Sequence, residues 1–519
     1  MNVIDFLDKG AQQHPDRIAI QDADESYTYS QLGELTHRIA NAIEHSGLGG
    51  RAHVATYAPN GALAYAVQYG IVRSGRVWLP LNVRNSIGEN IEVLQSLDAD
   101  WLFVHSAFAA DVERIRMECP RLKGIVCVDR ALADGVVSVS QWIDGRLGLF
   151  PEVRRTPDDV YAMLTTSGTT GRPKGVMLTH LNFECMVASF NARMQFDAPP
   201  VHLVVAPLTH AAGMFAGSML ALGVTQIIMP TPDPGQILRA IQEHRVSTIF
   251  LPPTLIYMLL AHPDIGDYDC TSLRYFLYGA APMSAEKLRE ATRRFGPVFF
   301  QVFGQTEALM IITTMTPAEH VEALADPAKQ DRLYSCGRPG PFVTVAVMDA
   351  DGALLPPGKS GEIVVRGNIV MSGYYGNPEA TAEVSSHGWH HTGDVGRFDS
   401  DGFLHLVDRK KDMIITGGFN VFPSEVEQII WMHPAVQDCA VVGVPHDKWG
   451  EAVMAVIELK PGMSVPADEI IALCRRHLGG VKTPKLVEFW PSLPRSSVGK
   501  VLKREIRAKF WKGRERMIN

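Results

Sequence analysis

The chain has 519 residues, of which 46% are hydrophobic and 20% charged, and its mean hydropathy is close to zero. This composition is typical of a folded globular protein and excludes a largely disordered chain. The 49 lysine and arginine residues are outnumbered by 56 acidic ones, which gives a formal charge of −7. No global basic field therefore favours nucleic acid or an anionic membrane as a partner.

Seven cysteines are scattered along the chain without CxxC spacing. They favour neither a disulfide framework nor a zinc cluster, and they fit a reducing compartment. The start of the chain lacks a basic region followed by an apolar one, and no run approaches 18 apolar residues. We therefore expect a soluble, cytoplasmic protein without a membrane span.

The first 150 residues alternate amphipathic helical stretches with short apolar runs at 78–81 and 101–104. This alternation predicts parallel strands joined by crossover helices. The same pattern resumes later in the chain, with strands predicted at 202–207, 226–229 and 247–251 and helices at 234–244 and 285–295. The sequence thus predicts an α/β fold with doubly wound sheets.

From about residue 337 to 408 the chain changes to short strands separated by glycine, proline and aspartate turns, which predicts a β-rich subdomain. A new α+β pattern follows, with helices predicted at 424–432 and 467–478 and strands at 439–444 and 453–459. We place a domain boundary near 408–412. It separates an N-terminal domain, 1–408, from a small C-terminal domain, 409–519.

The segment 165–175 is rich in threonine and glycine and lies between two apolar runs. Glycine allows close approach, so such a loop can present backbone N–H groups and hydroxyls to phosphate oxygens. Lys174 adds a positive charge. The Walker A pattern GxxxxGK[ST] is absent, so the usual P-loop inference does not apply. The candidate phosphate contacts are Thr165, Thr166, Ser167, Gly168, Thr169, Thr170, Gly171 and Lys174.

Two further motifs follow predicted strands. Gly279, Ala280, Ala281 and Pro282 end one strand, and their small side chains leave room for a flat base; alone they are also typical of a strand-to-helix turn. Thr306 and Glu307 follow the strand 298–302. The hydroxyl suits a phosphate and the carboxylate suits Mg²⁺, although a helix N-cap is an alternative for this pair.

Asp394, in the run WHHTGD, is a candidate ligand for both hydroxyls of a ribose, and Arg409 near the predicted boundary suits sugar or phosphate oxygens. His390 and His391 precede it, and we interpret them as solvated or packed rather than metal-binding. Lys500 ends a glycine-supported loop in the C-terminal domain. It reaches a site in the large domain only if the small domain folds over it.

The ordered motifs TTSGTTGRPKG, YGAAP, FGQTE, TGD, DRKKDMIITGGFNVFPSEVE and PRSSVGK resemble those of the adenylate-forming superfamily, over nearly the whole chain. Within this superfamily the chain is most similar to the free-standing acyl- and aryl-CoA synthetases, because it contains the segment GGFNVFP and has no attached carrier domain. The resemblance implies an ATP-dependent acid–CoA ligase with ATP, Mg²⁺ and CoA, a carboxylic acid as partner, and a mobile C-terminal domain. It is compatible with a homodimer.

The resemblance also implies residue roles. The segment 165–175 is the phosphate loop, residues 279–282 are the adenine shelf, and Asp394 is the ribose anchor. Thr306 contacts the α-phosphate, and Glu307 is the Mg²⁺ ligand. The remaining roles are carried by Arg409 at ribose or phosphate, Lys411 at the hinge, Gly417 and Gly418 in the thiol channel, Lys500 in adenylation and His210 as a gate near the acyl carboxylate.

Phe303 and Thr209 depart from the family pattern, which has tyrosine at the first position and an aromatic residue at the second. Two alternatives to the CoA ligase stay open: an adenylating enzyme that passes the acyl group to a carrier protein or another acceptor, and a nucleotide-binding module without catalysis. Apolar residues around 211–215, Tyr257 and 309–311 either line a hydrophobic acyl pocket or pack the core. A fatty, alicyclic or aromatic acid is expected, and a dicarboxylic acid is disfavoured.

Overall fold

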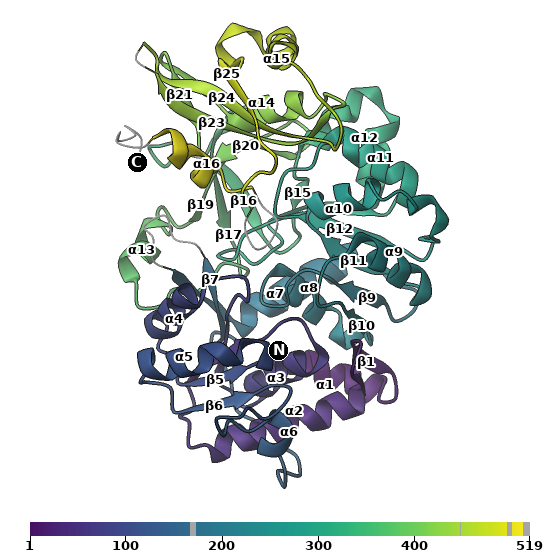
Figure 1. Cartoon of the computed structure of the whole chain (residues 1–519), viewed down its shortest axis with the longest axis vertical. Helices are drawn as coiled ribbons and strands as arrows, with labels where there is room; N and C mark the ends of the chain where they lie inside the picture. Colours follow the sequence, from purple (N-terminus) through teal and green to yellow (C-terminus); the bar gives the residue numbers. More distant parts are fainter. Residues whose placement is uncertain (167–172, 410–411, 447, 496–500, 512–519) are drawn as a thin grey trace.

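The computed structural model describes residues 1–166, 173–409, 412–446, 448–495 and 501–511. Within these residues the strands form four sheets. The N-terminal helices lie at one end of the long axis of the molecule and the last helices at the other (Figure 1). The fold is α/β, as the sequence predicts.

A seven-stranded sheet has the order β18-β8-β7-β4-β3-β5-β6. The strands from β6 to β7 are parallel, whereas β7, β8 and β18 pair antiparallel. Its strands are β3 His53–Tyr57, β4 Val77–Pro80, β5 Trp101–Val104, β6 Gly124–Cys127, β7 Val160–Thr166, β8 Lys174–Thr179 and β18 Gly373–Tyr374.

A nine-stranded sheet has the order β15-β14-β13-β12-β11-β9-β10-β1-β2, and its strands from β13 to β1 are parallel. The strands are β1 Ile18–Gln21, β2 Ser26–Thr28, β9 Val201–Val204, β10 Thr225–Ile228, β11 Thr248–Leu251, β12 Tyr275–Gly279, β13 Phe299–Phe303, β14 Thr313–Met315 and β15 Arg338–Pro339.

A four-stranded antiparallel sheet, β16-β17-β19-β20, and a five-stranded sheet complete the fold. Their strands are β16 Thr344–Met348, β17 Gly361–Arg366, β19 His390–Phe398, β20 Leu404–Arg409, β21 Ile414–Thr416, β22 Phe419–Val421, β23 Val436–His446, β24 Gly450–Leu459 and β25 Leu486–Phe489. The boundary predicted at 408–412 includes the last two residues of β20 and the start of the connection to β21, and it stays a prediction.

Helices connect the strands. They are α1 Val3–Gln13, α2 Tyr29–His45, α3 Ala62–Arg73, α4 Ile87–Ser96, α5 Val112–Glu118, α6 Val139–Trp142, α7 His180–Arg193, α8 Ala211–Ser218, α9 Pro234–Glu243, α10 Pro253–Leu260, α11 Ala285–Phe295, α12 Pro317–Ala325, α13 Pro378–Glu383, α14 Pro423–Ile430, α15 Ala467–Lys482 and α16 Lys503–Phe510. Four 3₁₀ helices also lie in the described residues: η1 Ser106–Asp111, η2 Leu220–Leu222, η3 Ile265–Asp267 and η4 Pro327–Tyr334.

Local chemistry explains where several helices begin. Helices α2, α4 and α12 start with capping boxes, in which a serine or threonine accepts from the backbone N–H of N3 and the N3 side chain bonds back. Proline occupies the first turn of α9, α10 and α14, where a missing N–H costs nothing. These starts are local and are therefore readable from the sequence.

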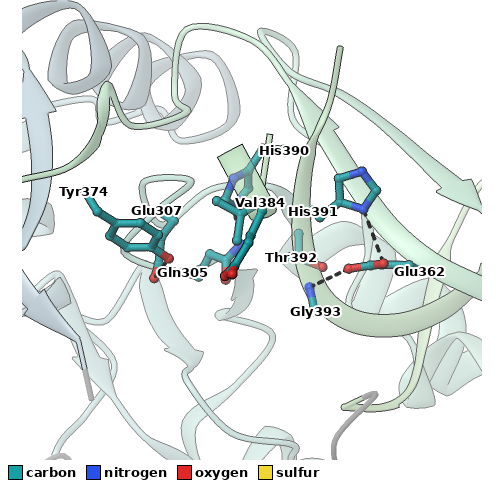
Figure 2. A pocket seen from close by; sticks show the side chains of 10 residues that line it. Gln305, Glu307, Glu362, Tyr374, Val384, His390, His391, Thr392 and Gly393 are labelled. Atoms are coloured by element: carbon teal, nitrogen blue, oxygen red, sulfur yellow. Dashed lines mark hydrogen bonds and ion pairs between the residues drawn. The ribbon is translucent and has the colours of Figure 1, made fainter. Parts of the chain in front are cut away.

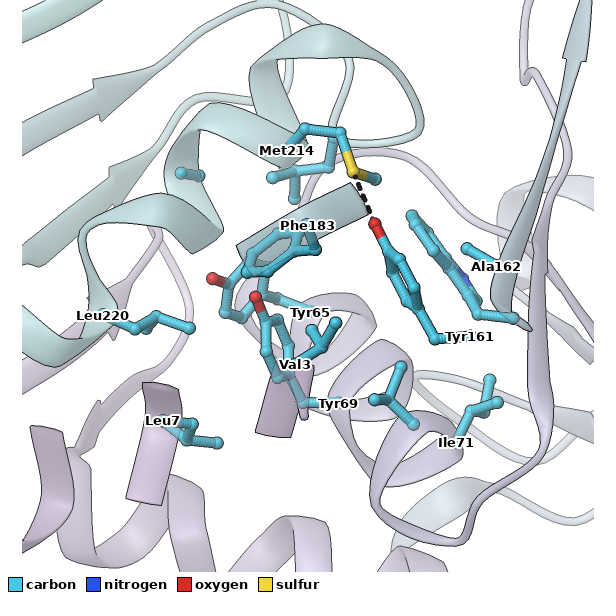
Figure 3. Packing of buried hydrophobic residues seen from close by; sticks show 14 of the residues in the cluster. Val3, Leu7, Tyr65, Tyr69, Ile71, Tyr161, Ala162, Phe183, Met214 and Leu220 are labelled. Carbon is cyan, nitrogen blue, oxygen red and sulfur yellow. Dashed lines mark hydrogen bonds between the residues drawn. The ribbon is translucent and has the colours of Figure 1, made fainter. Parts of the chain in front are cut away.

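The largest buried cluster lies between the seven-stranded sheet, the N-terminal helices and α8 (Figure 3). In it Tyr161 is fully enclosed and its hydroxyl lies 3.2 Å from the sulfur of Met214. A second cluster covers the other face of the nine-stranded sheet, under α9 to α11. In the described part of the chain, no helix is long and apolar enough to cross a membrane.

Candidate functional site

The predicted nucleotide motifs meet at one edge of the nine-stranded sheet. Strands β9, β11, β12 and β13 are parallel, so their carboxyl ends lie along the same edge. His210 follows β9, the segment 279–282 ends β12, and Glu307 follows β13. Open α/β sheets bind ligands at this edge.

The threonine- and glycine-rich segment is the loop of an antiparallel hairpin. Thr165 pairs with Gly175 and Thr166 with Lys174 in β7 and β8. The segment thus connects two antiparallel strands that are neighbours in the seven-stranded sheet, unlike a P-loop, which leads from a strand into a helix. The predicted contacts Ser167, Gly168, Thr169, Thr170 and Gly171 lie outside the described residues.

The Glu307 carboxylate connects the two sheets. Thr166 donates to its Oε1 at 3.4 Å, and the Tyr374 hydroxyl donates to the same oxygen at 2.9 Å. The backbone carbonyl of Glu307 accepts from Met371 N at 2.8 Å. The carboxylate predicted to bind Mg²⁺ is therefore fixed beside the base of the threonine-rich loop.

Tyr374 was not predicted as a site residue. It lies in β18, whose two residues pair with β8 and so bring the tyrosine to the hairpin. The Lys174 Nζ lies 4.9 Å from the centre of its ring, within the range of a cation–π contact. Burial and the neighbouring Glu307 raise the pKa of Tyr374, which keeps the hydroxyl protonated as a donor.

A cavity of about 180 Å³ opens beside Glu307 (Figure 2). It is lined by Gln305, Glu307, Glu362, Tyr374, Glu383, Val384, His390, His391, Thr392 and Gly393. The lining combines the turn after β13, the strand β18 and the start of β19. Thr306 is not among the lining residues. The segment 305–309 forms turns and bridges rather than a helix, so the alternative that Thr306 and Glu307 form a helix N-cap is wrong.

The two histidines of the WHHTGD run line this cavity. His390 is buried, its Nε2 lies 2.8 Å from the side-chain amide nitrogen of Gln305, and burial lowers its pKa to about 4. His391 Nδ1 lies 3.3 Å from Glu362, and its Nε2 lies 2.7 Å from the Ser386 hydroxyl. Among the described residues, no group of three His, Cys, Asp or Glu could hold a metal ion by itself.

Asp394 is buried directly beyond the cavity wall. Its N–H donates to the Thr392 hydroxyl at 3.2 Å, and Gly393 N donates to Glu362 at 3.2 Å. In the sheet register Asp394 pairs with Arg409. The predicted ribose anchor and the predicted arginine are thus neighbours across two antiparallel strands.

The predicted adenine shelf is packed tightly against β13. A Cβ at Gly279 would lie 2.4 Å from the carbonyl oxygen of Val302, so only glycine fits there. Ala280 has a positive φ of 65°, which is uncommon for a residue with a side chain. The chain therefore turns sharply out of the sheet at this edge, before α11 begins.

His210 is the N-cap residue of α8. Its Nδ1 lies 2.9 Å from the Thr209 hydroxyl, and burial together with the nearby positive charge of Arg84 lowers its pKa. The imidazole is therefore kept neutral. Met214 and Phe215, further along α8, pack in the core, as do Tyr257 and residues 309–311, which favours the core-packing alternative for these residues.

Gly417 and Gly418 form the two-residue turn between β21 and β22, with φ angles of 58° and 84°. Two successive positive φ angles are typical of a type I′ hairpin turn. Gly417 N donates to the Trp449 carbonyl at 2.9 Å. Lys411 and Lys500 lie outside the described residues.

The structure thus brings Thr166, Lys174 and Glu307 together, with Asp394 close behind the cavity. It also adds Tyr374, Gln305, Glu362, Glu383 and His390, which sequence reasoning missed or set aside. Their roles as ligand contacts stay predictions. A local signal existed for His390, since it adjoins the TGD motif, but none existed for Tyr374.

Comparison with known proteins places these features in a family. Residues 7–375 match the family described as AMP-binding enzyme, and residues 425–500 match the AMP-binding enzyme C-terminal domain. A medium/long-chain-fatty-acid–CoA ligase, FadD8 of Mycobacterium tuberculosis, is 42% identical over 369 residues; the match covers 70% of this chain but only 63% of that relative. A feruloyl-CoA synthase of an Amycolatopsis species is 36% identical, over 96% of this chain and 97% of its own.

Among solved structures, the amide bond synthetase McbA of Marinactinospora thermotolerans superposes with a TM-score of 0.88 at 31% identity. The superposition covers 98% of this chain and all of that one. The likeness extends over both the large and the small parts of the fold.

Proposed function

The chain belongs to the AMP-binding enzyme family, and from this premise we propose that it is an AMP-forming acid–CoA ligase. It joins a carboxylic acid to CoA in two steps and consumes ATP. The observation that carries the proposal is the position of Glu307, which is bonded to both Thr166 and Tyr374 and faces the cavity. A phosphate-binding loop and a carboxylate for a divalent cation then serve one nucleotide.

The residues at Glu307 fit Mg²⁺. A single carboxylate beside a cavity suits this ion, which takes few protein ligands and completes its shell with water and substrate phosphate oxygens. We propose Glu307 as its protein ligand. When bound, the ion would neutralise charge on the phosphates.

In the first step, a carboxylate oxygen of the acid attacks the α-phosphorus of ATP. The bond from that phosphorus to the bridging oxygen breaks, and pyrophosphate leaves. Negative charge grows along the line of displacement and must be stabilised. We assign this to the loop 165–175, to Thr306 at the α-phosphate and to Lys500. The adenine lies against 279–282 and the ribose hydroxyls bond Asp394, with Arg409 beside them.

In the second step, the CoA thiol attacks the acyl carbon of the adenylate and AMP leaves. We propose that the small domain turns about Lys411 between the steps, so that Gly417 and Gly418 line the thiol channel. The main support is the tight two-glycine turn, which presents backbone without side chains. In the first step, His210 acts as the gate residue beside the carboxylate of the acid.

The acid is a hydrophobic fatty, alicyclic or aromatic one. This follows from the acids named for the relatives, a medium/long-chain fatty acid and a feruloyl acid. A cytoplasmic location goes with the proposal, because the seven cysteines are buried and free.

A second candidate keeps the first step but passes the acyl group to an acceptor other than CoA. The likeness to an amide bond synthetase favours it, because that name implies an amine acceptor on a similar fold. Incubation with ATP, Mg²⁺, a panel of acids and either CoA, a carrier protein or an amine separates the two. The proposal predicts AMP, pyrophosphate and acyl-CoA in equal amounts. AMP release with no thioester to CoA would favour the second candidate.

A further inference from the structure

Asn60 follows strand β3 of the seven-stranded sheet and precedes helix α3. The start of α3 is fixed, because Ala62 N donates to the Asp22 carboxylate at 2.7 Å. Asn60 is half-buried, and its side chain is directed away from its own sheet, towards loops of the nine-stranded sheet. It therefore lies in a short connection between two elements of its own sheet region but makes its side-chain contacts with the other sheet.

The Asn60 amide makes three hydrogen bonds with backbone groups of those loops. Its Oδ1 accepts from Leu208 N at 2.9 Å, and its Nδ2 donates to the Ala206 carbonyl at 3.1 Å and to the Met229 carbonyl at 3.4 Å. These groups follow the carboxyl ends of β9 and β10. One side chain thus fixes two neighbouring loops at the ligand-binding edge of the sheet.

The loop that Asn60 bonds leads directly to His210. His210 N donates to the Pro207 carbonyl at 3.1 Å, which closes a turn immediately after Ala206. On the other side, a Cβ at Gly213 would lie 1.8 Å from the Leu208 carbonyl oxygen, so α8 is pressed against the same turn. The position of the imidazole is therefore determined by Asn60 on one side and by α8 on the other.

We propose that Asn60 is a positioning residue for His210 and through it sets the affinity for the acid. The inference rests on the proposed function, because it takes His210 as the group beside the acyl carboxylate. The turn that carries His210 is held by hydrogen bonds of its backbone, so a small shift of the turn displaces the ring from the carboxylate. Displacements of about 1 Å in such groups cost on the order of 100-fold in rate.

Two variants test the inference. Asn60→Ala removes all three bonds, whereas Asn60→Asp has nearly the same shape but turns an oxygen towards the carbonyls of Ala206 and Met229. In acid-dependent pyrophosphate–ATP exchange, both are expected to lower kcat/KM for the acid about 10- to 100-fold. This fall should come from a higher KM for the acid, while the KM for ATP should change by less than about twofold.

The matched control is Asn41→Ala, which removes a bond of 3.1 Å to the Gly148 carbonyl far from this edge and should behave as the wild type.

The decisive readout is a double-mutant cycle. In a His210→Ala background, the additional change Asn60→Ala should lower kcat/KM for the acid by less than about threefold. Additive effects, an equal rise in both KM values, or a His210→Ala variant as active as the wild type would overturn the inference. If the wild type shows no acid-dependent exchange, the proposed function itself fails, which is a separate result.

Discussion

The contact between Tyr374 and Glu307 shows how a single side chain prepares the site. The phenol donates to one carboxylate oxygen at 2.9 Å, while Lys174 lies over its ring. The bond limits the rotation of the carboxylate and leaves the other oxygen, Oε2, for a cation. Preorganisation of this kind is needed for precise metal binding, because the outer partners orient the ligand.

Tyr374→Phe should therefore weaken Mg²⁺ use without abolishing it. A hydrogen bond to a charged group contributes about 1.5–3 kcal/mol, so the Mg²⁺ concentration for half-maximal exchange should rise about tenfold or more. Tyr375→Phe is a matched control, since Tyr375 donates to Asp98 at 2.9 Å, outside the residues that line the cavity. Equal Mg²⁺ dependence in all three proteins would contradict the assignment.

Sequence reasoning found Glu307 but not Tyr374, and the reason is physical. Glu307 comes four residues after the end of a strand whose apolar run is readable, so its place at the sheet edge follows from the local pattern. Tyr374 reaches the site only because a two-residue strand adds to β8, about 200 residues earlier in the chain. Its neighbour Tyr375 is the same residue type, and no local property distinguishes the two.

At the scale of elements, the helices and strands that were predicted by range are confirmed, whereas their end residues are predicted less accurately. Helix α11 spans the predicted 285–295, and β5 spans the predicted 101–104. The strand predicted at 202–207 ends at Val204, because the following backbone turns away to bond Asn60. Helix α13 and strand β18 inside the predicted β-rich segment were missed, since both are too short for a periodic signal.

The β21–β22 turn allows the two half-reactions to be separated. Gly418→Val places a branched side chain at a positive φ, in open space. We expect it to reduce conversion of supplied acyl-adenylate and CoA to thioester more than it reduces adenylation. Gly402→Val is the control, because Gly402 has a φ of 79° and is also unobstructed, in the turn between β19 and β20.

Both variants should lose about 1–3 kcal/mol of stability from backbone strain. Only the Gly418 variant should show the unequal effect on the half-reactions. A Gly402 variant with the same imbalance would attribute it to strain and not to the thiol channel.

At the scale of the whole molecule, buried histidines make stability depend on pH. Burial lowers the pKa of His202, His320 and His390 from 6.5 to about 4. Above pH 6.5 these groups are neutral in both states and contribute nothing. Between pH 6.5 and 4 the unfolded chain binds protons that the folded chain does not, so the free energy of unfolding falls.

Urea unfolding measured at pH 7.0 and 5.0 tests this expectation. Each such histidine removes up to about 3 kcal/mol over the full range. His202→Asn should therefore lose less stability on acidification than the wild type, whatever its stability at pH 7. A wild type equally stable at both pH values would contradict the burial argument.

The C-terminal domain offers a second whole-molecule prediction. Lys500→Ala should lose adenylate formation by about 100- to 1000-fold, since it removes one preorganised charge from the first step. It should still convert supplied acyl-adenylate and CoA to thioester. Lys509→Ala, where the ammonium packs 3.8 Å from the centre of the Trp490 ring, should leave both steps unchanged. Equal loss of both steps in Lys500→Ala would exclude the assignment.

The central claim is that this chain activates a carboxylic acid as its adenylate. Exchange of labelled pyrophosphate into ATP, measured with Mg²⁺ and without CoA, tests it most directly. We predict exchange that requires a hydrophobic acid and that is abolished in Glu307→Gln. Exchange without any acid, or its absence with every fatty, alicyclic and aromatic acid in a broad panel, would contradict the account.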